Sequence, residues 1–236
     1  MGSGKQEEFT IAYLLDPSLV YPICLTIKTC LVSIVMFLLL GVPLAFWISR
    51  SEGFISKLVS FLVTLPLVFP PVALGYILLM TLGRSGIGGI LEEYTGFRLV
   101  FSHTGVFLAA FIAGLPMLVR PLQAAMRGEM VLKLEEAARV TGCDPFRTFI
   151  FVTVPLVRGT IASGLLLGSA RASGEVGITM MVGGNISGRT NTISLEIFNR
   201  VSRGEFDEAG TLCLLLAVFG LLLFVALEKL QKKKES

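Results

Sequence analysis

The sequence predicts an all-α, polytopic membrane protein with five transmembrane helices. Apolar residues make up 53% of its 236 residues and charged residues only 16%, and the mean hydropathy is +0.79, a balance that few soluble domains of this length reach. Several apolar runs approach or exceed the ~20 residues that a helix needs to cross a ~30 Å hydrocarbon layer. Because a segment in lipid must satisfy its own backbone hydrogen bonds, these runs are expected to be helices.

Five runs are expected to cross the membrane, at residues 20–48, 58–82, 104–126, 157–182 and 209–227. The first run is too long for an upright helix and contains Lys28 and Pro43, so we expect it to tilt or to extend beyond the lipid, with Lys28 reaching an interface. Prolines interrupt the second and third runs at Pro66, Pro70, Pro71, Pro116 and Pro121. Because proline removes a backbone donor and clashes one turn back, we expect kinked helices there.

The distribution of Lys and Arg predicts an external N-terminus and a cytoplasmic C-terminus. The basic residues on the cytoplasmic side would be Arg50, Lys57, Arg120, Arg127, Lys133, Arg139, Arg147, Arg158, Lys229, Lys232, Lys233 and Lys234. Those on the external side would be Lys5, Arg84, Arg98, Arg189, Arg200 and Arg203. This excess on one side agrees with the positive-inside rule. The net charge of +3 is therefore explained by membrane topology and gives no indication of nucleic-acid binding.

No residue pattern predicts a catalytic or metal site. The four cysteines, at positions 24, 30, 143 and 213, show no CxxC spacing, and we interpret them as packing residues. His103 is the only histidine, and at an expected membrane boundary it is assigned a structural role. We expect no cleavable signal peptide, because the start is polar and acidic and the first apolar run is far longer than a signal h-region.

The cytoplasmic connection from residue 127 to residue 155 alternates charges with small and apolar residues. Its pattern predicts two short helices with a break near Gly142 and Asp144. The small alanines of this segment allow close approach to another protein, and Phe146 and Phe149 are candidate anchors for that protein. The alternative is an amphipathic loop that lies on the lipid surface.

Two external segments have helical apolar stripes. In the first, the stripe is Ile87, Ile90, Leu91, Tyr94 and Phe97. In the second, it is Ile193, Ile197 and Val201, with Glu196, Arg200 and Arg203 available on other faces. Both segments are interpreted as interfacial amphipathic helices, and both are also candidate platforms for an external protein.

Two groups of polar residues are candidates to line or close a polar pathway through the membrane. Arg171 and Glu175 are spaced i, i+4 within an expected span, which places them on one face of a helix as either a structural ion pair or a pathway element. The loop at residues 183–190 offers backbone donors together with Asn185 and Arg189, which would attract an anion at the outer mouth. The alternative for this loop is a simple glycine-rich turn.

The connection at residues 127–155 resembles the EAA loop of the membrane subunits of ABC importers. That family motif runs Glu-Ala-Ala, three residues, Gly, nine residues, Ile, one residue, Leu-Pro. The same spacing is met here by Glu136, Ala137, Ala138, Gly142, Val152, Val154 and Pro155. Val152 replaces Ile and Val154 replaces Leu, and both departures are conservative. A bare EAAxxxG would be weak evidence, but the long spacing to Pro155 and the membrane context make the match specific.

The resemblance extends from about residue 20 to about residue 227 and narrows to the molybdate/tungstate (molybdate-sulfate) permeases. The segments that resemble bacterial molybdate permeases are residues 65–76 with 82–86, 115–120, 170–177 and 184–190. Residues 173–176 read Ser-Gly-Glu-Val, where molybdate permeases more often have Leu-Gly-Glu-Phe. Val176 with residues 180–185 leans toward tungstate permeases. Sulfate permeases share the Gly-Glu pattern but are typically longer, so we expect molybdate first, tungstate next and sulfate third.

The resemblance implies a type I ABC importer permease fold, a single transmembrane domain over residues 1–236 with its coupling loop at residues 127–155. It implies a homodimer with a central pathway in a bacterial or archaeal plasma (inner) membrane. Two cytoplasmic ATPase subunits and an external oxyanion-binding protein would be its partners. The residues assigned to ATPase coupling are Glu136, Ala137, Ala138, Gly142, Phe146, Val154 and Pro155.

The chain itself is not expected to be an enzyme. It contains no GxxxxGK[ST] phosphate loop, so ATP and Mg²⁺ would bind the partner ATPase and no cofactor is expected here. An intramembrane enzyme is a rival class, but Glu175 lacks a His, Cys or second carboxylate partner within the spans, and no GxSxG elbow is present. A membrane scaffold is a second rival, and it would leave the spacing of the cytoplasmic motif unexplained.

Overall fold

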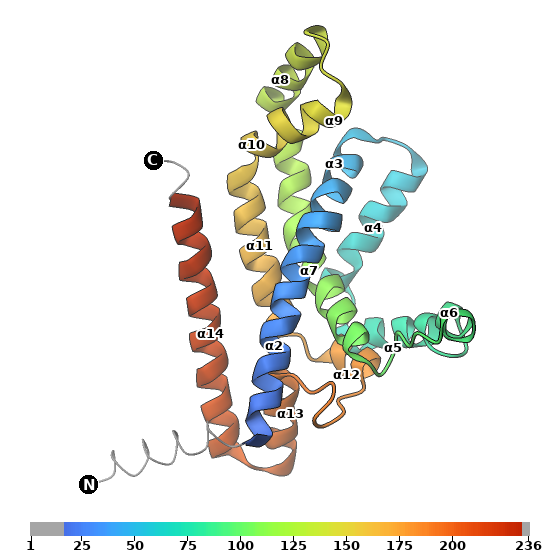
Figure 1. Ribbon diagram of the computed structural model, residues 1–236, viewed down its shortest axis with the longest axis vertical. Coiled ribbons are helices and arrows are strands. Elements are labelled where there is room, and N and C mark those ends of the chain that lie inside the picture. The colour runs from blue at the N-terminus through green and yellow to red at the C-terminus, as the bar shows by residue number, and fades with distance from the viewer. Residues whose placement is uncertain (1–16, 233–236) are drawn as a thin grey trace. The chain divides into compact units, whose positions relative to one another are not determined.

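The computed structural model describes residues 17–232, and every regular element in this range is a helix, as the sequence predicted. The elements are α2 (Pro17–Met36), η1 (Phe37–Gly41), α3 (Val42–Arg50), α4 (Phe54–Val68), α5 (Pro71–Leu82), α6 (Ile87–Thr95), α7 (His103–Met126), α8 (Glu129–Val140), α9 (Pro145–Thr148), η2 (Phe149–Thr153), α10 (Val154–Leu156), α11 (Arg158–Ser173), α12 (Gly177–Gly183), α13 (Ile193–Arg203) and α14 (Phe206–Lys232), as labelled in Figure 1. The labels η1 and η2 mark π-helical segments.

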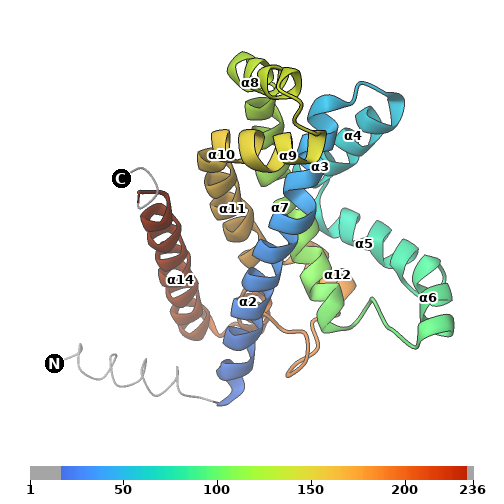
Figure 2. The same cartoon turned by 45° about the horizontal axis from the view of Figure 1, so that its top comes forward.

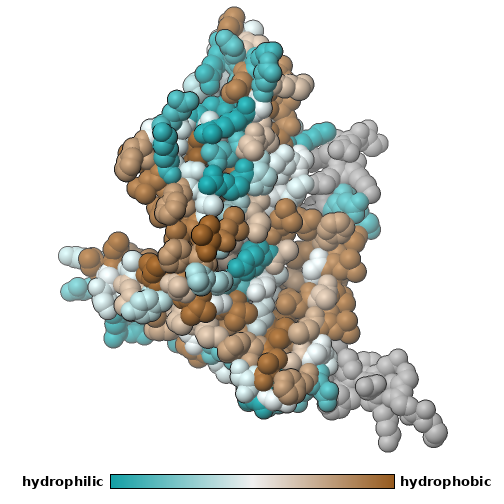
Figure 3. Space-filling view, turned by 180° about the vertical axis from the view of Figure 1, so that it is seen from behind, coloured by the Kyte–Doolittle hydropathy of each residue, from teal (hydrophilic) through white to brown (hydrophobic). Residues whose placement is uncertain are grey.

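Three helices in the described range are long and apolar enough to cross a membrane: Leu19–Arg50, His103–Met126 and Phe206–Val225. They correspond to the first, third and fifth expected runs, and hydrophobic residues cover much of the surface seen in Figure 3. Two further pairs of helices pass the same test only together. These are Pro71–Leu82 with Ile87–Thr95, bent by 46°, and Pro145–Leu156 with Arg158–Ser173, bent by 75°. The expected five crossings are reached only if each bent pair is one span.

The predicted orientation stays a prediction. Lys5, Lys233 and Lys234, on which it partly depends, lie outside the described residues.

The second expected run, residues 58–82, is not one kinked helix but two helices, α4 and α5. The break falls at Pro70, whose ψ of 130° is outside the helical region. Pro71 favours this break, because a proline disfavours the α conformation in the residue before it. Pro71 then occupies the first turn of α5, where its missing N–H costs no hydrogen bond.

The fourth expected run, residues 157–182, is also divided, because α11 ends at Ser173 and α12 begins at Gly177. Between them, the buried carboxylate of Glu175 accepts a hydrogen bond of 2.8 Å from the backbone N–H of Ile178. This bond satisfies one of the unpaired donors at the start of α12 and places a carboxylate at the positive end of the helix. The break is therefore stabilised by a side chain that the sequence pattern assigned to a helix face.

Both π-helical segments lie one turn before a proline. Pro43 follows η1 and Pro155 follows η2, each as the second residue after the segment ends. A proline ring clashes with the carbonyl four residues earlier, which here belongs to Leu39 and to Phe151, both inside the π segments. The wider π turn absorbs that clash, so the helical backbone continues through each proline.

The chain forms two compact units, each with its own packing. Of the described residues, unit 1 comprises 17–33, 69–110 and 172–222, and unit 2 comprises 34–68, 111–171 and 223–232. Helices α2, α7, α11 and α14 contribute residues to both. The expectation of a single domain over residues 1–236 stays a prediction.

In unit 1, small residues bring backbones together. A Cβ built on Gly75 of α5 would lie 3.0 Å from the Cα of Ile178 on α12, and one on Gly177 would lie 2.8 Å from Pro71. A second cluster joins Leu19, Ile193 and Leu212. Figure 2 shows α5 leading into α6 through the bend that follows Gly83.

In unit 2, α7 and α11 approach each other at glycines. A Cβ on Gly114 would overlap the backbone carbonyl of Gly168 and the ring of Phe37, and Phe37 also packs against Phe111 with ring centroids 5.5 Å apart. A Cβ on Gly164 would similarly lie 2.6 Å from Leu118. Such contacts let helices pack closely in a lipid environment.

The close approach of α7 and α11 predicts opposite effects for two glycine-to-alanine substitutions. Gly114→Ala is expected to lower the free energy of unfolding by about 1–3 kcal/mol, because the backbones must separate. Gly159→Ala on α11 meets nothing within 4 Å and is expected to be neutral or to stabilise by up to about 1 kcal/mol, because alanine favours a helix. Denaturation of both variants in detergent measures this, and equal stabilities would contradict the packing described.

Candidate functional site: a helical hairpin

The segment at residues 129–156 of unit 2 forms a helical hairpin of α8, α9, η2 and α10 (Figure 1). The turn is made by Gly142, whose φ of +88° favours glycine. Asp144 then begins α9 by accepting a hydrogen bond of 2.6 Å from the backbone N–H of Arg147. The predicted pair of short helices with a break near Gly142 and Asp144 is confirmed.

A buried ion pair fastens this hairpin to α3. Glu135 of α8 is 2% exposed, and its carboxylate accepts two hydrogen bonds from Arg50 at the end of α3. The Nε atom of Arg50 lies 3.0 Å from Oε2, and Nη2 lies 2.7 Å from Oε1. This bidentate geometry fixes the relative orientation of α3 and α8 as well as the distance between them.

The same carboxylate also holds η2. The hydroxyl of Thr153, a fully buried residue, donates to Glu135 Oε1 at 2.6 Å, and Arg139 lies 3.9 Å from Oε2. Glu135 therefore joins α8 to η2 within the hairpin and to α3, whose Arg50 is 85 residues away in the sequence. We call Arg50, Glu135 and Thr153 the hairpin anchor.

Phe149, predicted as an anchor for another protein, instead packs inside unit 2. Its ring lies 4.5 Å from that of Phe46 on α3, and the guanidinium of Arg50 lies 5.5 Å from the centre of the Phe46 ring. Phe149 therefore supports the hairpin anchor with an aromatic contact, and this part of the prediction was wrong.

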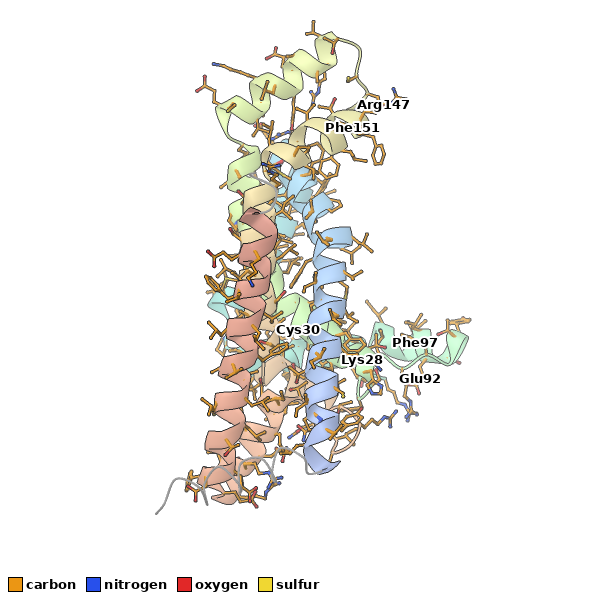
Figure 4. All side chains as sticks on the ribbon, turned by 60° about the vertical axis from the view of Figure 1, so that its left-hand side comes forward. Lys28, Cys30, Glu92, Phe97, Arg147 and Phe151 are labelled. Atoms are coloured by element: carbon orange, nitrogen blue, oxygen red, sulfur yellow. The ribbon has the colours of Figure 1, made fainter. Side chains whose placement is uncertain are left out.

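The other predicted coupling residues lie on or near the surface of the hairpin. Glu136, Ala137, Gly142, Phe146 and Pro155 are exposed, and Ala138 and Val154 are partly buried. Four large apolar side chains are among the most exposed here: Met130 at 71%, Val140 at 84%, Phe146 at 70% and Phe151 at 74%. Figure 4 shows Phe151 and Arg147 on the hairpin, and hydrophilic residues gather at the end that carries α8 in Figure 3. The hairpin is therefore held to α3 through Glu135, and its outer surface exposes several apolar side chains.

Sequence reasoning missed Glu135 and Arg50. Val131 and Glu135 are the buried residues of α8 and are spaced i, i+4, whereas the motif residue Glu136 is exposed. The sequence held one signal for this role: Glu135 lies on the same helix face as the apolar Val131. A carboxylate on a buried face needs a cationic partner inside the fold.

The pathway candidates Arg171 and Glu175 do not share a helix face. Arg171 is in the last turn of α11, whereas Glu175 lies beyond the end of that helix and caps α12. The i, i+4 argument was wrong because it assumed an unbroken helix through Gly174.

The loop at residues 183–190 is held by its own side chains and by α2. Asn185 exchanges hydrogen bonds with Asn199 at 2.7 and 3.2 Å, and the hydroxyl of Thr190 accepts from the backbone N–H of Ile186. The backbone carbonyl of Arg189 accepts from the hydroxyl of Tyr21, which also bonds to His103 at 2.7 Å. His103 thus has the structural role predicted for it, and an anion-attracting role for Asn185 and Arg189 stays a prediction.

The second expected amphipathic helix, α13, forms, but its charges are not free. Glu196 is 8% exposed and bonds to Arg200 at 2.7 Å and to Asn191 at 2.5 Å, while Arg200 also pairs with Glu205 and Glu208. Burial raises the pKa of Glu196, but the hydrogen bonds from Arg200 and Asn191 outweigh it and hold the pKa below its usual range.

Nothing in the described range forms a metal centre, since no three His, Cys, Asp or Glu side chains come together there. All four cysteines are free; Cys30, labelled in Figure 4, is buried, and Cys24, Cys143 and Cys213 are exposed. The packing role expected for the last three stays a prediction.

Apolar helices of membrane-spanning length, combined with a protruding hairpin that carries the EAA spacing, define the class of membrane subunits of ABC importers. The chain belongs to the family of binding-protein-dependent transport system inner membrane components, whose model matches residues 38–234. It is thus a multi-pass protein of the bacterial inner membrane.

Two curated relatives and one solved structure illustrate this membership. The chain is 35% identical over 206 residues to the molybdenum transport system permease protein ModB of Azotobacter vinelandii, covering 86% of this chain and 90% of that protein. It is 34% identical over 217 residues to ModB of Escherichia coli K12, covering 90% and 94%. A bacterial ABC transporter that imports the acidic polysaccharide alginate has the same fold, with a TM-score of 0.72 at 18% identity over 94% of this chain and 82% of that one.

The hairpin anchor predicts different effects for two adjacent glutamates. Glu135→Gln removes the buried charge opposite Arg50 and is expected to lower the free energy of unfolding by about 3 kcal/mol. Glu136→Gln alters an exposed side chain and is expected to leave stability within about 0.5 kcal/mol of the wild type. Thermal unfolding of the purified variants distinguishes them. If the Glu135 variant were as stable as the Glu136 variant, the anchor would not hold the hairpin.

Proposed function

We propose that this chain is the transmembrane permease subunit of an ATP-driven importer of molybdate. The observation that carries the proposal is the anchored hairpin, whose exposed motif residues are available to a cytoplasmic partner. The names of the relatives in Azotobacter vinelandii and Escherichia coli support molybdenum as the cargo. In this proposal the N-terminus is external and the C-terminus cytoplasmic.

The ATP-binding partner would dock on the hairpin. Phe146 and Val140 are largely exposed apolar side chains, of the kind that act as anchors when a partner buries them. Because this chain has no phosphate loop, two ATPase subunits would supply the sites for ATP and Mg²⁺. A second copy of the chain would complete the central pathway.

Coupling follows from the hairpin anchor. A force that the ATPase applies to α8 reaches α3 through the Arg50–Glu135 pair and reaches η2 through Thr153, because one carboxylate bonds to both. Elements joined in this way move together as a rigid body between discrete arrangements. Closure of the ATPases on ATP would thus be converted into a rotation of the attached helices that opens the pathway outward, and hydrolysis would reset it.

An external oxyanion-binding protein would deliver the cargo. A solved complex of the alginate transporter with its periplasmic protein supports a partner of this kind. A dianion moving through the pathway should bind weakly at each point, because tight binding would prevent release. Selectivity among molybdate, tungstate and sulfate would then reside mainly in the binding protein.

The test is ATP hydrolysis in liposomes that contain this chain, its genome-neighbour ATPase and the cognate binding protein loaded with molybdate, tungstate or sulfate. Stimulation by the molybdate-loaded protein is the expected result. Stimulation by tungstate or sulfate alone would correct the cargo. Failure of the ATPase to assemble with the chain would reject the importer and favour a membrane scaffold.

The docking face is tested in the same liposomes with two exposed phenylalanines. Phe146→Ala is expected to reduce ATPase binding about tenfold or more, as removal of an interface anchor does. Phe54→Ala, at 81% exposure on α4 and outside the hairpin, is the matched control and should bind the ATPase normally. Equal binding by both variants would contradict a docking face centred on Phe146.

A further inference from the structure

Unit 2 contains a cavity of about 910 Å³ that the transport motif does not explain. Its walls come from the end of α3, the α3–α4 connection, α4, α7 and Leu132 of α8. Four cationic side chains line it together with one carboxylate, and these residues are Arg50, Lys57, Arg120, Arg127 and Glu52.

The charges of this cavity are not balanced. Arg50 is neutralised by Glu135, as described above. Arg127 donates only to the backbone carbonyls of Ile48 and Ser49, at 3.2 and 3.3 Å. Among the described residues, neither Arg127 nor Arg120 forms an ion pair. The cavity therefore carries an excess of positive charge.

Arg120 is held in place by neutral groups alone. Its Nη1 atom donates to the Ser60 hydroxyl at 3.0 Å and to the Gln123 side-chain carbonyl at 3.2 Å, and its Nη2 atom donates to the Thr64 hydroxyl. Gln123 is buried and Arg120 is half-buried. A guanidinium in this setting is oriented without a counter-charge, so an anion that enters the cavity gains a charge-assisted bond with little reorganisation.

Hydroxyl groups complete the wall beside Arg120. The Ser60 oxygen accepts from Arg120, which leaves its own proton available to a ligand. A planar guanidinium next to a hydroxyl donor suits the closely spaced oxygens of a tetrahedral oxyanion. Lys57 and Arg127 add charge at longer range without fixing geometry.

We propose that this cavity is a binding site for a tetrahedral oxyanion, occupied by the transported dianion after it leaves the central pathway and before its release. The cargo in this proposal rests on the proposed function, which also assigns the cavity to the cytoplasmic side because it adjoins α8. A phospholipid headgroup offers the same phosphate-like chemistry, so the test must separate the two sources.

The test uses the full chain in nanodiscs of zwitterionic lipid and measures the binding of sodium molybdate and sodium sulfate by equilibrium dialysis at low ionic strength. Saturable binding to the wild type is expected. Arg120→Gln is expected to weaken it at least tenfold. Arg158→Gln, which removes an exposed positive charge from the start of α11 outside the cavity, is the matched control and should bind as the wild type does.

A second variant keeps the proposal testable if Arg120→Gln fails to fold. Ser60→Ala removes the hydroxyl donor to the ligand and one of the three bonds that orient Arg120, whose bonds to Gln123 and Thr64 remain. A weakening of about threefold or more is expected. Equal affinities in the wild type, Arg120→Gln and Ser60→Ala would overturn the site. Absence of saturable binding in zwitterionic nanodiscs, with phosphatidylglycerol retained by the wild type but not by Arg120→Gln, would overturn it in favour of a lipid headgroup.

The outcomes for this site and for the importer are separable. If the binding protein stimulates ATP hydrolysis but the Arg120 and Arg158 variants bind oxyanion equally, the importer stands and the cavity site fails. If oxyanion binding depends on Arg120 but no ATPase assembles with the chain, the site stands and the importer fails.

Discussion

The bidentate ion pair between Arg50 and Glu135 is the contact on which the position of the hairpin depends. A carboxylate that is 2% exposed is costly to bury, and only well-placed donors offset that cost. Here the donors come from two different elements, since Arg50 belongs to α3 and Thr153 to η2. The hairpin is consequently a fixed lever rather than a loop. In the proposed function, this rigidity would let a partner that contacts Phe146 act on helices that Phe146 does not touch.

Proline and glycine determine where the helices bend and where they meet. Pro43 and Pro155 are each absorbed by a π-helical turn, whereas the Pro70–Pro71 pair ends one helix and starts another. Val42 and Val154, which precede Pro43 and Pro155, keep helical backbone angles, whereas Pro70, which precedes Pro71, has a ψ of 130° and leaves the helix. Gly114 has a different function, because it lets α7 approach the backbone of α11. Pro43, Pro155 and Gly114 belong to unit 2, which also contains the hairpin anchor and the cationic cavity.

Much of this arrangement could be predicted from the sequence, and the errors have physical causes. The membrane class, the hairpin and its turn at Gly142 follow from hydropathy, helical period and spacing, which are local properties. Glu135 was missed because its importance comes from Arg50, a partner 85 residues away. Arg171 and Glu175 were placed on one helix because spacing cannot reveal that α11 ends at Ser173. The cavity around Arg120 was missed for the same reason as Glu135, since its partners Ser60 and Thr64 lie on another helix.

The proposed coupling requires that α8 and α3 move as one body when the partner ATPases close. The most direct measurement is the distance between spin labels at positions 133 on α8 and 47 on α3, in a variant without native cysteines, assembled with the ATPase and the binding protein. The account predicts that this distance changes by less than about 2 Å between the nucleotide-free and ATP-trapped states. A change of about 5 Å, the length of one helical turn, would show that the hairpin moves independently and would contradict transmission through Glu135.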